Sequence, residues 1–456
     1  MNWQTLAPEL IFQILSKFLP GLTLPVVKPE FFPWYLGHIC SSWRAVFKSS
    51  PQFWSAFVID LDWMSAERYV ERALLLTEMC IQRSQTHPLS FQFKFNGGIG
   101  FELSHCHKQV LQALMAQSTR WLNAYFYLPR TQASFLYAVK TQLPILRAFR
   151  LTYSGLNFNK DLPQFGDLIE DAPLVRRVRI IDYPAWKLNW SSITTLHLEF
   201  INEVQPELLV NFLQAIDHLE ELYLGCFEST GSPPRITLPF LRCLGITMMG
   251  NLLLFETPAL EELYITAFSD MSPAQYYVWV PNYVGLLHHL QKIVLFLTSI
   301  DTAVMIFQYL PDTENIDFYV TDLTILKILP LCPLARRLET MTVGVITLYD
   351  DSKLKAILHI FESWRMHSNA ATGFGRFEGL KRFTLKLQKK DPMNSRREFS
   401  RGWTQEYHDR FVFEFTSLFS ERGVPCSINQ VRDLNEYDVA VPPFDIFGGQ
   451  EADYLL

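Results

Sequence analysis

This sequence lacks three features: closely spaced cysteine pairs, long apolar stretches, and an N-terminal segment in which basic residues precede an apolar core. The seven cysteines are scattered, and no two of them form a Cys-x-x-Cys pair. This pattern argues against a disulfide framework or a structural zinc site, and it fits a reducing compartment. No apolar run reaches the roughly 18 residues that a membrane-spanning helix needs, and the first residues lack the pattern of a signal peptide. We therefore expect a cytoplasmic or nuclear protein that does not cross a membrane.

Catalytic and cofactor motifs are also missing. The sequence contains no Gly-x-Ser-x-Gly elbow, no phosphate-binding loop and no His-Glu-x-x-His helix. His105, Cys106 and His107 could ligate a metal in principle, but adjacent residues rarely converge on one ion without further ligands. The net charge of −6 gives no general attraction to nucleic acids. We expect no enzyme activity, cofactor, metal site or nucleic-acid partner; an enzyme, or nucleic-acid binding by an arginine cluster, is a weaker alternative.

Hydrophobic residues, by contrast, are plentiful. They make up 49% of the chain, which can bury a large core and argues against global disorder. A length of 456 residues exceeds what a single hydrophobic core usually holds. We therefore expect two or more units or an elongated stack of repeats.

The N-terminal segment, 1–60, predicts a small helical domain. Within residues 6–19, Leu10 and Ile14 recur four positions apart, and Ile11 and Leu15 form a second apolar stripe beside them. A second helical pattern follows before residue 50. A lone core of this size is marginal, so some of this apolar surface must dock on the rest of the chain or on a partner.

These residues resemble the F-box family over roughly residues 3–58. The match is an ordered set: Leu6-Ala7-Pro8-Glu9-Leu10, Ile14-Leu15, Leu19-Pro20, Cys40-x-x-Trp43-Arg44 and Pro51-x-x-Trp54. The sequence departs from the family at Ala7 and in a longer insert across residues 21–33. The resemblance implies binding to a Skp-type adaptor, and through it to a cullin, by Leu6, Pro8, Leu10, Ile14, Leu15, Trp43, Pro51 and Trp54. The alternative is that these faces pack internally.

Residues 61–142 predict an α/β linker domain. Helical spacing covers residues 64–86 and roughly 104–118. Apolar and polar residues alternate across residues 89–95, as in a strand, and a second strand is expected at residues 120–129. This succession resembles the region that joins the F-box to the repeats in a large group of F-box proteins.

From residue 143 a short phrase recurs: an apolar residue, two variable residues, an apolar residue, one variable residue and another apolar residue. It starts at residues 146, 175, 193, 219, 241, 260, 290, 313, 338 and 380. The mean step between these starts is about 26 positions, which lies inside the period of leucine-rich repeats. The phrase also resembles the strand of that family. We expect an α/β fold, with the F-box helical cluster followed by an irregular leucine-rich-repeat solenoid with a parallel sheet over residues 143–431.

The end of the chain predicts a cap and a tail. Residues 404–422 have the spacing of an amphipathic helix that would close the repeat array, and Gly423 fits its C-terminal cap. Residues 432–456 carry six acidic residues against Arg432, a net charge of −5. Their prolines and glycines predict an acidic, flexible tail.

The variable positions of the strands predict a binding surface. Arginines cluster on the first two strands, and glutamates with tyrosines beside them follow on the fourth and sixth. An aromatic residue flanked by charge on a rigid sheet is a plausible protein-binding anchor. The candidate target-binding residues are Arg147, Arg150, Arg177, Arg179, Glu221, Tyr223, Glu262 and Tyr264. The alternative is a solvated face without a ligand.

Taken with the resemblance, these features imply a substrate-recognition subunit of an SCF-type cullin ubiquitin ligase. The F-box would hold the adaptor, and the repeats would bind a target protein of unknown identity. The alternative is a leucine-rich-repeat scaffold or binding protein that does not act in ubiquitination.

Overall fold

Two compact units can be distinguished in the computed structural model of the chain. Unit 1 comprises Met1–Val204 with Phe444–Asp453, and unit 2 comprises Gln205–Pro443 with Tyr454–Leu456. The residues that the structure describes are 6–18, 24–25, 39–62, 67–96, 102–154, 167–181, 189–199, 206–216, 218–225, 235–248, 252, 254–267, 290–297, 314–320, 323–328, 339–345, 355–362, 381–388, 413, 416 and 426–431.

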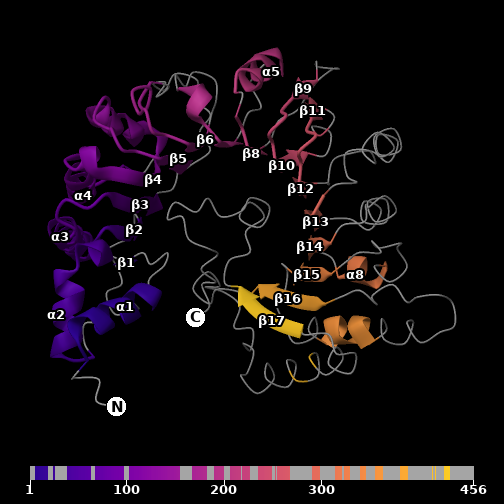
Figure 1. The fold of residues 1–456 in the computed structure, drawn as a ribbon, viewed down its shortest axis with the longest axis horizontal. Helices are drawn as coiled ribbons and strands as arrows, with labels where there is room; N and C mark the ends of the chain where they lie inside the picture. The colour runs from indigo at the N-terminus through magenta and orange to yellow at the C-terminus, as the bar shows by residue number, and fades with distance from the viewer. Residues whose placement is uncertain are drawn as a thin grey trace. The chain divides into compact units, whose positions relative to one another are not determined.

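Three short helices form the N-terminal cluster of unit 1 (Figure 1). They are α1 (Pro8–Phe18), α2 (Ser41–Ser49) and the 3₁₀ helix η3 (Pro51–Trp54). Pro8 and Pro51 each stand at the start of a helix, where the missing N–H costs no intrahelical hydrogen bond. The predicted helical start of the chain is therefore confirmed.

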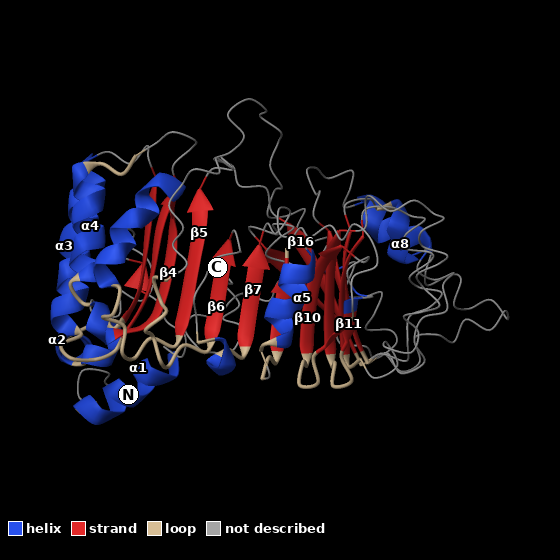
Figure 2. Cartoon of the chain, turned by 90° about the horizontal axis from the view of Figure 1, so that it is seen from above, coloured by secondary structure: helices blue, strands red, loops and turns tan. Residues whose placement is uncertain are grey.

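A parallel sheet forms the rest of unit 1, in the order β1-β2-β3-β4-β5-β6-β7. The strands are β1 (Leu24–Pro25), β2 (Ala56–Asp62), β3 (Leu89–Asn96), β4 (Trp121–Pro129), β5 (Ala148–Ser154), β6 (Arg177–Ile181) and β7 (Thr195–Glu199). The connecting helices are α3 (Glu67–Arg83), α4 (His105–Met115), η4 (Ser118–Arg120), η5 (Arg130–Val139) and η6 (Trp190–Ser192). Figure 2 shows the arrowheads of β5, β6 and β7 pointing the same way.

Aromatic side chains fill the core beside this sheet. The ring of Phe91 on β3 lies 5.1 Å from Trp121 and 5.5 Å from Phe126, measured between centroids. Phe126 in turn lies 6.3 Å from Phe149 on β5, and all four side chains are buried. Because successive side chains of a strand point to opposite faces, the residues directly before and after Phe91, Phe126 and Phe149 lie on the other face of the sheet.

Unit 2 contains a second run of parallel strands, in the order β8-β10-β12-β13-β14-β15-β16-β17. They are β8 (Glu221–Leu224), β10 (Cys243–Met248), β12 (Glu262–Ala267), β13 (Lys292–Leu297), β14 (Asn315–Val320), β15 (Thr340–Val345), β16 (Arg382–Gln388) and β17 (Cys426–Val431). The other described elements are β9 (Ile236–Thr237), which pairs with β11 (Phe255–Glu256), and the helices α5 (Pro206–Gln214), α8 (Thr324–Ile328) and 355–362.

The ten recurring phrases all become strands, and each strand begins at the third residue of its phrase. Where two of these strands pair within a unit, the third residue of one phrase is the register partner of the third residue of the other. Ala148 thus pairs with Arg177 in unit 1, and Cys243 pairs with both Glu221 and Glu262 in unit 2. Within each unit, the common register buries the described apolar positions of these phrases on one face. The prediction of an α/β protein with a large parallel sheet and several helices is confirmed.

Five strands were not predicted: β1, β2, β9, β11 and β17. In β2, which crosses the expected boundary between residues 60 and 61, Phe57, Ile59 and Leu61 alternate and are buried. This alternation could have revealed the strand, but a short apolar run directly after helices is ambiguous. β17 has little apolar patterning, and it is defined by its backbone pairing with β16.

Some expectations fall outside the described residues. The predicted acidic tail and almost all of the predicted cap helix lie there; in the cap, Phe413 and Thr416 alone are described, and both are helical. Among the helices that the structure describes, none is long and apolar enough to cross a membrane.

Candidate functional site

The two apolar stripes of α1 have different environments. Ile11 and Leu15 are buried within the helical cluster, whereas Leu10 is 48% exposed and Ile14, one turn further on, is only partly buried. The exposed stripe of α1, defined here as Leu10 and Ile14, therefore remains open to a partner. Exposed apolar residues gathered in one place are typical of interaction surfaces.

Three of the eight residues expected to touch the adaptor are instead internal. Leu15, Trp43 and Trp54 are buried. The indole Nε1 of Trp54 donates to the carbonyl oxygen of Phe47 across 2.8 Å, and the Arg83 guanidinium lies 4.3 Å from the centre of the Trp54 ring. Trp43 was expected to support the helices, and its burial agrees with that role; for Leu15 and Trp54, the expected direct contact is corrected to a supporting role inside the cluster.

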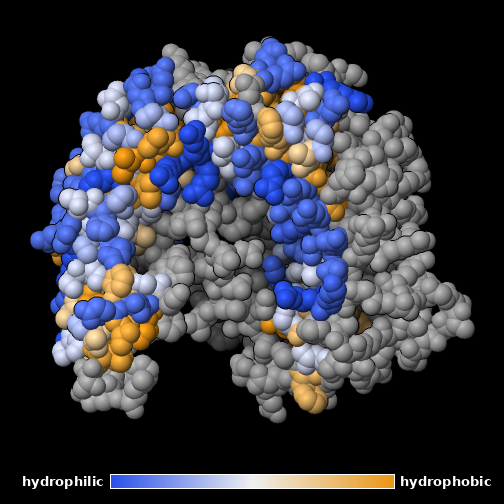
Figure 3. All heavy atoms as spheres, viewed as in Figure 1, coloured by the Kyte–Doolittle hydropathy of each residue, from blue (hydrophilic) through white to orange (hydrophobic). Residues whose placement is uncertain are grey.

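The other residues expected to contact the adaptor are more exposed to solvent. Pro8 is exposed, and Leu6 and Pro51 are partly buried. Ile39, two residues before the start of α2 at Ser41, is 48% exposed. Figure 3 shows hydrophobic side chains gathered over α1 and α2.

A row of charged and aromatic side chains crosses the sheet of unit 1 on the face opposite its core. Strand register aligns Tyr125 on β4, Arg150 on β5, Arg179 on β6 and His197 on β7. Arg150 Cζ lies 4.2 Å from the centre of the Tyr125 ring, a cation–π contact. Arg177 lies two residues before Arg179 on the same face. We call Arg150, Arg177, Arg179 and His197 the arginine face.

Electrostatics on the arginine face disfavour any further positive charge. Burial lowers the pKa of His197 well below its ordinary value, and the neighbouring Arg179 and Arg150 lower that pKa further. The imidazole of His197 is therefore neutral near pH 7. Neither Tyr125 nor His197 was among the residues predicted from the sequence. Their places became visible only when the strand register was known.

In unit 2, the tyrosines expected to be exposed anchors are buried between strands. Tyr223 Oη and Cys243 Sγ share a hydrogen bond of 2.8 Å, and the rings of Tyr223 and Tyr264 lie 6.0 Å apart. Tyr264 Oη donates to Glu262 Oε2 across 2.7 Å. Burial raises the pKa of both phenols, so both stay protonated. The expected exposure of these two tyrosines is therefore wrong.

Two glycines make room for tyrosines on the preceding strand. A Cβ on Gly245 would lie 2.2 Å from the ring of Tyr223, and a Cβ on Gly344 would lie 2.2 Å from the ring of Tyr319. The ring of each tyrosine therefore packs over the glycine that is its register partner on the next strand of the sheet. Lys386, the register partner of Gly344 on the next strand, donates to Tyr319 Oη across 3.3 Å.

The remaining target-binding candidates differ in accessibility. Arg147 is exposed, whereas Arg150, Arg177, Glu221 and Glu262 are partly buried. Arg179 is only 5% exposed. The structure brings the arginines together on unit 1 and Glu221 with Glu262 on unit 2, on either side of Cys243. Their role in binding a target remains a prediction.

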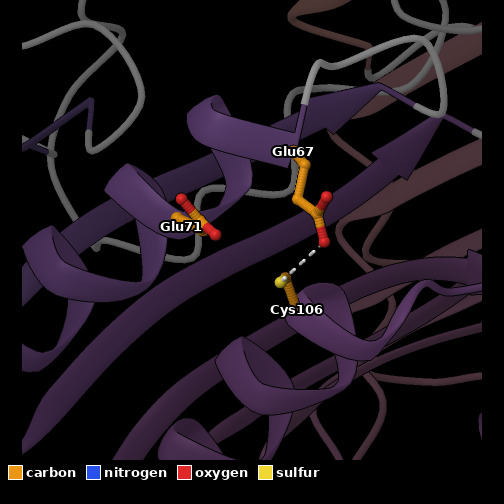
Figure 4. Close-up of side chains that lie close together, drawn as sticks. All are labelled: Glu67, Glu71 and Cys106. Carbon is orange, nitrogen blue, oxygen red and sulfur yellow. Dashed lines mark hydrogen bonds between the residues drawn. The ribbon is translucent and has the colours of Figure 1, made fainter.

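One group of possible metal ligands appears among the described residues, at the start of α3 and α4 (Figure 4). The ligand atoms of Glu67, Glu71 and Cys106 lie within 4.8 Å of one another. Burial, followed by both glutamates, raises the pKa of the Cys106 thiol, which donates to Glu67 Oε1 across 3.9 Å. A protonated thiol is a poor metal ligand and a poor nucleophile. His107 is not part of the group, because its ring packs 4.7 Å from Phe95.

Neither the family models nor the curated proteins compared with this chain include a match.

Proposed function

We propose that this protein is a substrate-recognition subunit of an SCF-type cullin ubiquitin ligase. The N-terminal helices would bind a Skp-type adaptor, and the strand faces would bind a target protein. The observation that carries the proposal is the division of α1 into one packed stripe and one exposed stripe, with Leu10 48% exposed. A helix with a free apolar stripe can dock in the groove of another protein.

The parallel strands support the second half of the proposal. Under it, the sheets belong to an irregular leucine-rich-repeat solenoid, whose register repeats the same side-chain positions on strand after strand. Such arrays use their exposed strand faces to hold partners. The protein's contribution to ubiquitination would be proximity, because holding a target beside the ligase converts an encounter between two molecules into an intramolecular step.

A second candidate is a leucine-rich-repeat scaffold that does not act in ubiquitination. It is favoured by the internal positions of Leu15, Trp43 and Trp54, which are part of the motif that resembles the F-box. In this alternative the N-terminal helices would only complete the fold of unit 1.

Affinity for a Skp-type adaptor separates the two candidates. The full chain is titrated with the purified adaptor, as wild type and as the Leu10→Asp, Ile14→Asp double variant. The matched control is Leu75→Asp on α3, because Leu75 is 65% exposed in the same unit. Loss of an apolar contact of this size is worth about 1.5–3 kcal/mol, so we expect the double variant to bind at least tenfold more weakly.

The control variant should bind the adaptor as the wild type does. Absence of adaptor binding by the folded wild-type chain would reject the ligase proposal and leave the scaffold. Equal losses in the double variant and the Leu75→Asp variant would show that α1 is not the docking helix.

A further inference from the structure

Turns of one kind lead into four of the strands, two in each unit. In each turn, the carbonyl of the residue before a proline accepts a hydrogen bond from the amide three positions further on; the turns are 143–146, 172–175, 238–241 and 257–260. Proline is favoured at the second position of such β-turns, because its ring fixes φ. The first and fourth residues are buried in every case, and the proline is exposed. The third residue is therefore held at the edge of the sheet by a rigid frame.

Phe240 is the largest of the four third-position side chains, and it is 55% exposed. The equivalent position of the next turn, before β12, holds only Ala259, which is too small to cover a phenyl ring. The exposed His218, which precedes β8, places its ring 6.0 Å from the Phe240 ring, measured between centroids. Phe240 and His218 therefore form a small aromatic patch where the strands of unit 2 begin.

The surroundings of this patch are acidic. Residues 218–225, 235–248 and 254–262 contain five glutamates against two arginines, a net charge of −3. The amide of Arg242 donates to the carbonyl of Glu220, and the amide of Glu261 donates to the carbonyl of Arg242, each across 2.8 Å, so these three residues lie side by side before β8, β10 and β12. Arg242 pairs with Glu261 across 2.7 Å. Glu220 is exposed and forms no ion pair with another described residue, so its carboxylate remains open to a cationic partner.

The corresponding edge of unit 1 has the opposite charge. Leu174 stands at the third position of its turn and is 41% exposed. The residues that follow the turns there are Arg147 and Arg176, which are both exposed and adjacent, because the amide of Arg176 donates to the carbonyl of Arg147 across 2.9 Å. An apolar side chain beside carboxylates is therefore a property of the unit 2 edge, and the unit 1 edge provides a matched control.

We propose that the turn edge of unit 2, defined by His218, Glu220 and Phe240, binds a segment of a partner protein in which an aromatic or aliphatic side chain is flanked by lysine or arginine. The apolar side chain packs on Phe240, and the basic residue pairs with Glu220. An exposed aromatic ring on a rigid frame is a frequent anchor of protein interfaces, and complementary charge beside it selects the partner.

This surface differs from the one that the proposed function invokes. It lies at the edge where the strands begin, whereas Tyr223 and Tyr264 on the strand face are buried. The proposal concerns unit 2 alone and does not depend on adaptor binding by α1. It holds equally for a ligase subunit and for a scaffold.

The test measures binding of a fluorescein-labelled heptapeptide that alternates lysine and phenylalanine. Fluorescence anisotropy at low salt compares the full chain as wild type, Phe240→Ala and Glu220→Lys. The matched controls are Leu174→Ala, at the equivalent turn position of unit 1, and Glu78→Lys, which makes the same charge change at an exposed position of α3. Two further peptides replace every phenylalanine by alanine or every lysine by glutamate. Circular dichroism confirms that each variant is folded.

We expect Phe240→Ala to weaken peptide binding about tenfold, because it removes the anchor, and Glu220→Lys to weaken it at least about threefold. The two control variants should bind as the wild type does. The alanine peptide and the glutamate peptide should each bind the wild type at least about tenfold more weakly than the parent peptide. Higher salt should weaken binding of the parent peptide, because part of the attraction is ionic.

The proposal is overturned if the folded wild-type chain does not bind the parent peptide, or if the folded Phe240→Ala variant retains full affinity. Equal losses in Phe240→Ala and Leu174→Ala would show general apolar adhesion. Equal losses in Glu220→Lys and Glu78→Lys would show a general charge effect. Either result would reject specific docking at the turn edge of unit 2.

Discussion

Replacing Gly245 with alanine tests whether Tyr223 is held across the neighbouring strand. A Cβ at this position would lie 2.2 Å from Tyr223 Cδ1, whereas ordinary contact begins at 3.4 Å. The ring must therefore move by about 1 Å before its atoms regain ordinary van der Waals contact. Tyr223 cannot move freely, because it is buried, hydrogen-bonded to Cys243 and packed against Tyr264.

The expected change in the free energy of unfolding combines two destabilising contributions with one stabilising contribution. Overpacking of a filled site costs about 1–3 kcal/mol, and weakening the hydrogen bond to Cys243 adds about 1 kcal/mol. Alanine also restricts the unfolded chain, which returns about 0.4–1 kcal/mol. We expect Gly245→Ala to lower the free energy of unfolding by about 2 kcal/mol.

A double-mutant cycle isolates the contact between the ring and the new methyl group. Urea unfolding followed by circular dichroism is measured for the wild type, Gly245→Ala, Tyr223→Ala and the double variant. Hydrogen exchange of β8, β10 and β12 reports whether the loss is local to these strands. Gly344→Ala with Tyr319→Ala repeats the cycle at a second site with the same geometry.

The informative quantity is the cost of Gly245→Ala in each background. Once Tyr223 is alanine, the methyl group has room, and Gly245→Ala should cost nothing or stabilise the protein by up to about 1 kcal/mol, because only its effect on the unfolded chain remains. Equal costs in the presence and absence of the Tyr223 ring would refute the reasoning. They would show that glycine is required there for backbone reasons alone.

Two further predictions concern unit 1. Trp54→Phe should lower the free energy of unfolding more than Trp43→Phe, by about 1 kcal/mol, in matched urea titrations. Trp54 Nε1 donates to Phe47, whereas the buried Trp43 Nε1 has no hydrogen-bond partner among the described residues, so equal costs would contradict this assignment. Because burial lowers the pKa of His197 in the folded state, the unfolded chain takes up its proton first as the pH falls below about 6.5. Stability should therefore decrease from pH 6.5 downward, by up to about 1.4 kcal/mol per pH unit, and a His197→Gln variant with an unchanged slope would contradict this origin.

Local sequence patterns predicted most secondary structure of the described part of the chain. The apolar spacing of α1, the alternation in β3 and the ten recurring phrases each led to an element of the expected type. These predictions succeeded because helices and strands bury every third or fourth and every second residue, respectively. β2 was missed because a short run of alternating residues directly after helices gives an ambiguous period.

Exposure of individual side chains could not be predicted in the same way. Arg179, Tyr223 and Tyr264 occupy variable positions of the phrase, which the pattern assigns to the solvated face, yet all three are buried. Their burial depends on neighbours contributed by other strands, such as the partner ring of Tyr264 for Tyr223. One strand's sequence contains no information about the side chains that the next strand places beside it.

The amino-acid sequence by itself therefore determined most of the helices and strands, because these follow from the short period of the apolar residues. Tertiary structure alone decided which stripe of α1 stays exposed, which arginines share a face and which glycines accommodate a tyrosine. These outcomes depend on contacts between residues about 20 to 40 positions apart in the chain, and such contacts form only when the strands and helices pack side by side.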